Sequence, residues 1–201
     1  MAEAAKTNVD DAVLVEQCRR GDSGAMERLI LKYQNRIYSV ILKMCANPDD
    51  AAELTQETFV KIIENIDRFG GRSGFYTWAF RIAVNLTLNH CQRSVRAGHW
   101  SLDAEDDEHN RQAKSQLKEF LSDDSSPDPA AVAQSKELCG IVAKALMKLD
   151  DSQRAVVILR DVEGMNYAEI ANVLNAELGT VKSRLSRARS NLKQILETML
   201  E

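Results

Sequence analysis

Apolar side chains recur every three or four residues through most of this chain, and few helix-breaking residues interrupt them. The segment 23–44 shows the pattern, with apolar residues at Ala25, Leu29, Tyr33, Ile37, Val40, Ile41 and Met44. This is the period of an amphipathic α-helix, whereas a half-buried strand alternates with a period of two. Only three prolines and nine glycines occur in 201 residues. The chain is therefore predicted to be all-α, and its 44% hydrophobic content is enough for buried cores.

The first half of the chain is predicted to form one compact helical domain, residues 10–97. Aspartates that can cap helices alternate with Gly and Pro residues that end them. After a loose terminus, the helices are expected to start at Asp10 or Asp11, at Ser23, at Asp49 or Asp50 and at Phe75, the last ending near Gln92. The third helix is expected to bury Leu54, Phe59, Ile62, Ile63 and Ile66.

A segment without helical periodicity, residues 98–129, is predicted to be a flexible acidic linker. Its acids cluster and it ends with two prolines, and such a composition buries too little apolar surface to repay its ordering. A short docked helix is an alternative that the sequence leaves open. Its apolar residues would be Trp100, Leu117, Phe120 and Leu121.

The last part of the chain, residues 130–201, is predicted to be a second small helical domain. Helices are expected over 130–149, from an Asp150 cap to Gly164, over 167–174, and from Thr180 to about Leu200. The last two are separated by a tight connection, and the second of them is basic. This is the helix-turn-helix arrangement, which places its second helix in the major groove of DNA.

Charge is divided along the chain, so the formal net charge of −4 is a poor guide to its partners. An acidic average argues against a nucleic-acid binder. However, the segment 68–102 carries five arginines and no carboxylate, and the terminal helix is basic as well. Between them, nine acids face three cations over 103–128. The local charge therefore keeps nucleic acid open as a partner.

The sequence shows no spacing typical of a metal or catalytic site. The cysteines are scattered, and reduced, mostly buried thiols are expected at Cys18, Cys45, Cys91 and Cys139. Without a phosphate-binding glycine loop or a nucleophile with its base, we predict neither an enzyme nor a protein with a cofactor or small-molecule substrate. No apolar run reaches the ~18 residues of a membrane span, and we expect a cytoplasmic protein without direct membrane insertion.

The stretch Gly179–Arg189 has the pattern of a basic amphipathic helix. At about 100° per residue, Val181, Leu185 and Ala188 fall on one side and form a stripe to be buried. The other side is basic or carries short hydrogen-bonding groups, at Lys182, Ser183, Ser186, Arg187 and Ser190. Such side chains contact phosphates and base edges. A helix that is only solvated would show the same pattern, so this stretch alone leaves both alternatives open.

Three groups of motifs resemble one known family when they are taken together. They are DAAELTQETF from Asp50, YTWAFRIAVN from Tyr76, and YAEIA from Tyr167 followed by GTVKSR from Gly179. In this order and spacing they resemble the bacterial extracytoplasmic-function (ECF) sigma factors, over nearly everything except the terminus and the linker. The resemblance implies an initiation factor with two domains that binds core RNA polymerase, recognises a promoter and opens it.

The first motif resembles the segment with which the family binds core polymerase. The resemblance assigns this contact to Asp50, Glu53, Leu54, Gln56, Glu57 and Phe59. Leu54 and Phe59 also suit a hydrophobic core, and Gln56 and Glu57 would otherwise form a solvated helix face. An acidic, amide-bearing face can fix the register of docking on a coiled coil of the largest polymerase subunit. Ala52 stands where the family usually has an acid, which predicts a weaker contact there.

The second motif, with the loop before it, resembles the segment that recognises the melted minus-ten element. The resemblance assigns DNA contacts to Arg72, Phe75, Tyr76, Arg81, Asn85 and Arg93. Aromatic rings stack on exposed bases for about 1–3 kcal/mol per base, and guanidinium groups bind the backbone. By the resemblance, the loop 68–75 captures a flipped base and Asn85 lies along the melted strand. Trp78 and Ile82 share a helix face and are expected in the core.

The third motif group resembles the helix-turn-helix that recognises the minus-thirty-five element. The resemblance assigns DNA contacts to Lys182, Ser183, Arg184, Ser186, Arg187 and Arg189. By position, Lys182, Ser183 and Arg187 would face the groove, whereas Arg184 and Arg189 would meet phosphates.

A free-standing helix-turn-helix regulator with a sensing N-terminal domain is the alternative function. Such a protein would bind a symmetric operator without polymerase. The aromatic and arginine-rich second motif argues against it, because a ligand sensor has no need of these residues. The resemblance instead implies core RNA polymerase, promoter DNA and an anti-sigma factor as partners. The spacing of residues in the sequence leads us to expect no metal and no cofactor.

Overall fold

The computed structural model describes residues 2–96 and 129–200, with side chains over 11–94 and 138–200. Every element in these ranges is helical. The N-terminal domain contains α1 (Ala2–Arg19), α2 (Ser23–Cys45), α3 (Pro48–Asn65), the short 3₁₀-helix η1 (Ile66–Arg68) and α4 (Phe75–Arg96). The C-terminal domain contains α6 (Pro129–Met147), α7 (Asp151–Val157), the π-helix η2 (Ile158–Val162), α8 (Tyr167–Leu174) and α9 (Leu178–Leu200). The predicted all-α class is confirmed, while the predicted linker lies almost wholly outside the described residues.

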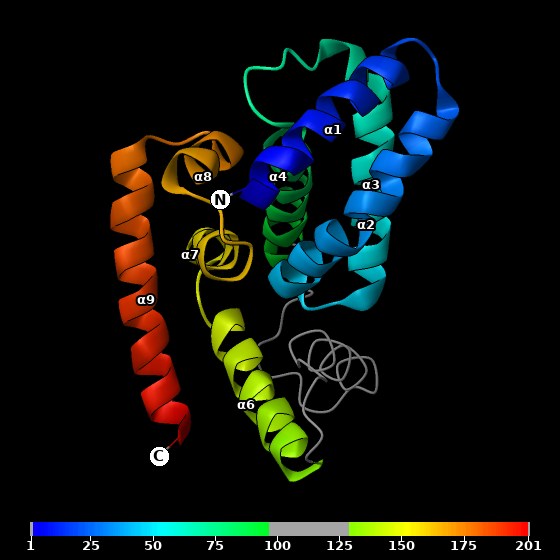
Figure 1. Cartoon of the computed structure of the whole chain (residues 1–201). Coiled ribbons are helices and arrows are strands. Elements are labelled where there is room, and N and C mark those ends of the chain that lie inside the picture. Colours follow the sequence, from blue (N-terminus) through cyan, green and yellow to red (C-terminus); the bar gives the residue numbers. More distant parts are fainter. Residues whose placement is uncertain (1, 97–128, 201) are drawn as a thin grey trace.

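The two domains pack directly against each other. In Figure 1, α7 and α8 lie between α4 of the N-terminal domain and α9, which runs along the outer side of the molecule. α4 packs on α8 and α7, and α2 packs on α7 and η2. The buried apolar residues accordingly form one cluster that continues from Val15 to Ala188. The interface between the domains is thus part of the hydrophobic core.

The helices α1 and α3 start earlier than the sequence pattern predicts. α1 begins at Ala2 rather than at Asp10 or Asp11, because the alanines that precede these aspartates are strong helix formers. Asp11 is instead buried, and its carboxylate accepts hydrogen bonds from Lys32 Nζ and Tyr33 Oη. α3 begins at Pro48 rather than at Asp49 or Asp50. Asn47 caps it, and proline suits the first helical position because its fixed φ is already helical.

The predicted core of α3 is correct at four positions and wrong at one. Leu54, Phe59, Ile62 and Ile66 are buried, whereas Ile63 is 48% exposed. Ile63 follows Ile62 and is turned away from it by the roughly 100° that separates neighbouring residues on an α-helix. Its side chain therefore points to the outer surface of α3, where it lines a groove.

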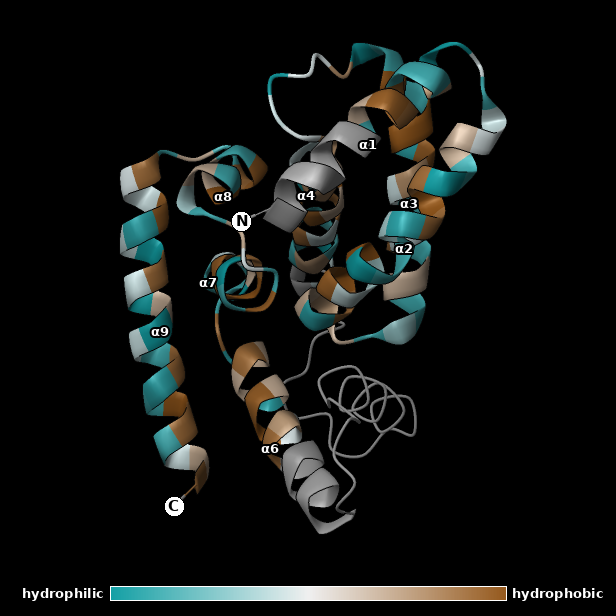
Figure 2. Cartoon of the chain, viewed as in Figure 1, coloured by the Kyte–Doolittle hydropathy of each residue, from teal (hydrophilic) through white to brown (hydrophobic). Residues whose placement is uncertain are grey.

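The helix-turn-helix has clear local causes. A capping box starts α8, in which the Asn166 side chain accepts from Glu169 N and the Glu169 carboxylate accepts from Asn166 N. Asn175 ends α8 in the left-handed region at φ 48°, which Asn tolerates better than most residues. α9 then begins at Leu178, two residues before the expected Thr180. Figure 2 shows hydrophobic and hydrophilic positions alternating along α9.

Cys18, Cys45 and Cys91 are buried, free thiols, as expected. Burial raises the pKa of Cys45 to about 12 and that of Cys91 to about 11. Both thiols are therefore almost fully protonated and poorly nucleophilic at neutral pH. Across the described ranges, no three or more His, Cys, Asp or Glu side chains gather where a metal ion could bind. None of the helices described is both long enough and apolar enough to cross a membrane.

Candidate nucleic-acid interface

The outward side of α9 presents four of the six residues assigned to the minus-thirty-five element. Val181, Leu185 and Ala188 are buried against the domain and fix the rotation of the helix about its axis. The opposite side is exposed at Lys182, Ser183, Ser186 and Arg187, and Arg184 is half-buried beside it. We call these four exposed residues the recognition face. It carries positive charge and hydroxyl groups on a rigid helix, which suits phosphates and base edges.

Arg189, the sixth residue of that set, is engaged within the protein. Its guanidinium forms a two-point ion pair with Asp161 of η2, with Nε 3.2 Å from Oδ2 and Nη2 bonded to Oδ1. The hydrogen bonds that Arg189 donates to Asp161 raise the pKa of Arg189 above its ordinary value. Arg189 thus ties α9 to η2, and a phosphate would have to compete with a carboxylate for it.

The six residues assigned to the minus-ten element fall into three kinds of environment. Arg72, Asn85 and Arg93 are exposed. Tyr76 and Arg81 on α4 are half-buried and hydrogen-bonded to the C-terminal domain. Phe75 is only 2% exposed.

Phe75 is the centre of an aromatic cluster in the N-terminal domain. Its ring lies 5.5 Å from that of Tyr33, 5.8 Å from that of Trp78 and 6.1 Å from that of Phe69, measured between centroids. Such tilted and edge-to-face pairs are favourable geometries for aromatic rings. In this arrangement Phe75 packs the start of α4 and does not offer its face to a base.

The residues assigned to core polymerase all lie on α3. Leu54 and Phe59 are buried, whereas Glu53, Gln56 and Glu57 are exposed. Asp50 lies 3.2 Å from His90 Nε2 and so connects α3 to α4. Beside them, a groove of about 540 Å³ is lined by Ile30, Gln34, Asn35, Tyr38, Ala52, Thr55, Gln56, Phe59, Val60 and Ile63. The exposed polar set therefore borders an apolar groove between α2 and α3.

Comparisons with known proteins decide the family. The Sigma-70 region 2 model matches residues 29–97 and the Sigma-70 region 4 model matches residues 139–192. The RNA polymerase sigma-H factor of Pseudomonas aeruginosa is 34% identical over 195 residues, which cover 96% of this chain and 97% of that protein. The ECF RNA polymerase sigma-E factor of Escherichia coli K12 is 33% identical over 191 residues, covering 94% and 96%. The chain belongs to the ECF sigma factors.

Solved structures agree with the fold of this sigma factor. The structure of CnrH in complex with the cytosolic domain of CnrY has a TM-score of 0.64 at 23% identity, covering 94% of this chain and 98% of that one. RpoE from Bartonella quintana in complex with the anti-sigma factor NepR gives 0.63 at 21% identity, covering 85% and 96%. As a member of its family, this protein is an alternative sigma factor that directs transcription. The matches thus favour this function over that of a free-standing helix-turn-helix regulator. All assigned contact residues lie inside the two matched regions.

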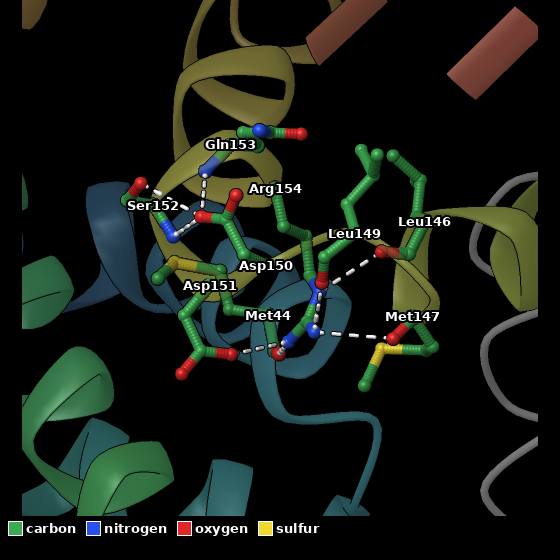
Figure 3. Close-up of polar contacts among 9 residues, drawn as sticks. All are labelled: Met44, Leu146, Met147, Leu149, Asp150, Asp151, Ser152, Gln153 and Arg154. Carbon is green, nitrogen blue, oxygen red and sulfur yellow. Dashed lines mark hydrogen bonds and ion pairs between the residues drawn. The ribbon is translucent and has the colours of Figure 1, made fainter. Parts of the chain in front are cut away.

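A buried arginine that no sequence pattern marks lies between the two domains of this sigma factor. Arg154 on α7 is 3% exposed, and burial lowers its pKa although Asp151, 3.3 Å away, opposes the shift. Figure 3 shows its guanidinium among backbone carbonyls at the ends of two helices. Within its own domain it donates to Leu146 O and Met147 O in the last turn of α6 and to Leu149 O just after it, and across the interface it donates to Met44 O. The guanidinium thus binds carbonyls in and just after the last turns of α6 and α2, where carbonyls lack intrahelical donors.

Two more residues without a sequence signal connect the domains. Arg36 Nη2 lies 3.1 Å from the carboxylate of Glu163, and Tyr76 Oη donates to the same carboxylate oxygen at 3.2 Å. Arg36 and Glu163 are 127 positions apart in the chain. Neither residue belongs to a motif that marks it, so only the tertiary structure reveals the pair.

Proposed function

We propose that this sigma factor directs core RNA polymerase to promoters with two elements and assigns one element to each domain. The N-terminal domain, residues 10–97, would bind core polymerase and the minus-ten element, and the C-terminal domain, residues 130–201, the minus-thirty-five element. The observation that carries the proposal is the exposed recognition face on a helix-turn-helix that matches Sigma-70 region 4. The segment 98–129 would join the domains.

The recognition face would enter the major groove of the minus-thirty-five element. Lys182, Ser183 and Arg187 would contact base edges, because they lie on the exposed side opposite the buried stripe. Arg184 and Ser186 would hold phosphates and thereby fix the position of the helix. Arg189 would act through Asp161, by keeping α9 fixed on η2.

The minus-ten strand would first bind residues that are already exposed, and then residues that the C-terminal domain covers. Arg72, Asn85 and Arg93 are exposed and available to a single strand. Tyr76 and Arg81 would add a stacking ring and a cation once their contacts with the C-terminal domain are broken. Phe75 supports this surface from within the aromatic cluster.

Core polymerase would dock on the exposed side of α3. Glu53, Gln56 and Glu57 would set the register by charge and hydrogen bonding, while the groove bounded by Gln56 and Phe59 would receive apolar side chains. Leu54 would shape this surface from the core, and Asp50 would hold α3 on α4. Attachment to polymerase then raises the effective concentration of both DNA-binding surfaces at the promoter.

We infer three further properties from the family. The protein acts as an initiation factor without enzymatic activity of its own, and it works in the cytoplasm, where core polymerase acts. An anti-sigma factor is its third partner, since the structurally similar RpoE from Bartonella quintana was solved with the anti-sigma factor NepR. A pull-down from the native host with the tagged chain tests this partnership.

The central experiment separates DNA recognition from polymerase binding. Arg187→Ala should lower transcription from a promoter found by start-site mapping by roughly 5- to 150-fold, the range for one lost base contact of about 1–3 kcal/mol. Binding of core polymerase should stay unchanged in a pull-down. Lys193→Ala, an exposed cation on the same helix outside the recognition face, serves as the control. Loss of polymerase binding by Arg187→Ala, or unchanged transcription, would contradict the assignment.

A further inference from the structure

Glu163, in the turn after η2 of the C-terminal domain, has a carboxylate that contacts the N-terminal domain. Its side chain is 7% exposed and accepts hydrogen bonds from Arg36 on α2 and Tyr76 on α4. The Arg36 guanidinium also lies over the Tyr76 ring, 4.6 Å from its centroid, and donates to Tyr76 Oη at 3.0 Å. A guanidinium and a phenol held together by a stacking contact form a site for an anion, and Glu163 occupies it.

Each domain also supplies an arginine to the end of a helix on the other domain. Arg81 on α4 donates from Nε to Asn172 O in the last turn of α8, at 2.8 Å. In the opposite direction, Arg154 donates to Met44 O in the last turn of α2 (Figure 3). Carbonyls in the last turn of a helix lack partners within the helix, and a cation there also interacts favourably with the helix dipole. The contacts are therefore reciprocal and charge-complementary.

Two residues of this interface, Tyr76 and Arg81, belong to the set assigned to the minus-ten element. A DNA phosphate would use the same donors that Glu163 and Asn172 O use in the closed arrangement. Because Glu163 is part of the same chain, it competes at the effective concentration of an intramolecular group. Closure thus occupies part of the strand-binding surface, while the recognition face on α9 stays exposed.

We propose that the free sigma factor is autoinhibited at its minus-ten surface, with Glu163 occupying the Arg36–Tyr76 site as an internal substitute for a DNA phosphate. The inference rests on the proposed function, since it takes Tyr76 and Arg81 to be strand-binding residues. Opening of the interface frees both side chains together with the anion site, which then binds a backbone phosphate of the single strand.

The test uses charge reversal in the full chain with a matched control. Glu163→Lys places a cation beside Arg36, whereas Glu197→Lys makes the same charge change on the exposed end of α9. Small-angle scattering should show a larger radius of gyration for Glu163→Lys but not for Glu197→Lys. Fluorescence anisotropy with a labelled 12-nucleotide single strand should show roughly tenfold tighter binding than Glu197→Lys. Arg36→Ala, at a half-exposed residue, opens the same contact without introducing a charge into the interface.

The outcomes separate this proposal from the proposed function. The autoinhibition is overturned if Glu163→Lys and Arg36→Ala both keep the radius of gyration of the wild-type chain. It is also overturned if Glu163→Lys binds the single strand no more tightly than Glu197→Lys does. A core-polymerase pull-down is run on the same proteins. Failure of the wild-type chain to bind core polymerase overturns the proposed function, whereas intact binding together with unchanged scattering overturns the autoinhibition alone.

Discussion

The two surfaces assigned to promoter DNA differ in how the rest of the chain uses them. α9 packs on α6, α7 and α8 of its own domain and keeps the recognition face exposed. α4 packs on α2 and α3 of its own domain and also on α7 and α8 of the other. As a result Tyr76 and Arg81 on α4 donate hydrogen bonds across the interface. One surface is available in the isolated chain and the other is partly occupied.

The width of the apolar side of each helix explains this difference. α9 buries a narrow stripe at Val181, Leu185 and Ala188, which its own domain can cover. α4 buries Ala79 and Phe80 and, one turn later, Ala83 and Val84, so that neighbouring positions both need cover. A helix with a wider apolar side needs neighbours in more than one direction. The C-terminal domain supplies one of these neighbours, and its polar rim then meets the polar residues of α4.

The largest effect is expected at the buried arginine between the domains. Arg154→Ala should lower the free energy of unfolding by about 3 kcal/mol, because it removes the side-chain donor of the Met44 and Leu149 carbonyls and leaves Asp151 without its buried cationic partner. Urea denaturation followed by circular dichroism measures this change as a shift of the midpoint.

An exposed arginine provides the comparison for that measurement. Arg187→Ala lies on the recognition face and should change stability by no more than about 0.5 kcal/mol. Equal destabilisation by the two substitutions would show that the interface around Arg154 is not formed in solution. A changed denaturant slope for Arg154→Ala would instead indicate that the domains no longer unfold together.

A smaller effect is expected at Arg189, which distinguishes support from recognition on one helix. Arg189→Ala breaks an exposed ion pair with Asp161, and such pairs contribute about 0–1 kcal/mol. Its effect on binding to a minus-thirty-five duplex should be smaller than that of Arg187→Ala, and Asp161→Asn should reproduce it. Titration of both variants against the same labelled duplex provides the measurement. If Arg189→Ala lost more affinity than Arg187→Ala, Arg189 would be a direct DNA contact.

Local sequence was sufficient to predict most of the fold. The period of apolar residues predicted α8 at its observed bounds, and Asp150 caps α7 as expected. Errors arose where two signals competed at a helix start. Asp10 and Asp11 look like caps, yet the alanines before them continue the helix, and Pro48 starts α3 although it also ends the preceding pattern.

The candidate site was less predictable because its decisive contacts join residues far apart in the chain. The recognition face follows from the helical period alone, since the buried and exposed sides of α9 are set by local spacing. In contrast, the contact of Tyr76 with Glu163 spans 87 positions and that of Arg154 with Met44 spans 110. No local pattern indicates which carboxylate or carbonyl such a side chain will meet. Only the tertiary structure therefore reveals that the C-terminal domain covers part of α4.

The difference between the two surfaces is tested most directly by adding core polymerase. Two labelled probes are titrated with the free chain, with core polymerase alone and with both: a short minus-ten single strand and a short minus-thirty-five duplex. If polymerase binding opens the domains, affinity for the single strand should rise by roughly tenfold or more, because the binding-competent fraction increases. Affinity for the duplex should change much less. Equal gains for both probes, or full single-strand affinity in the free chain, would contradict the account.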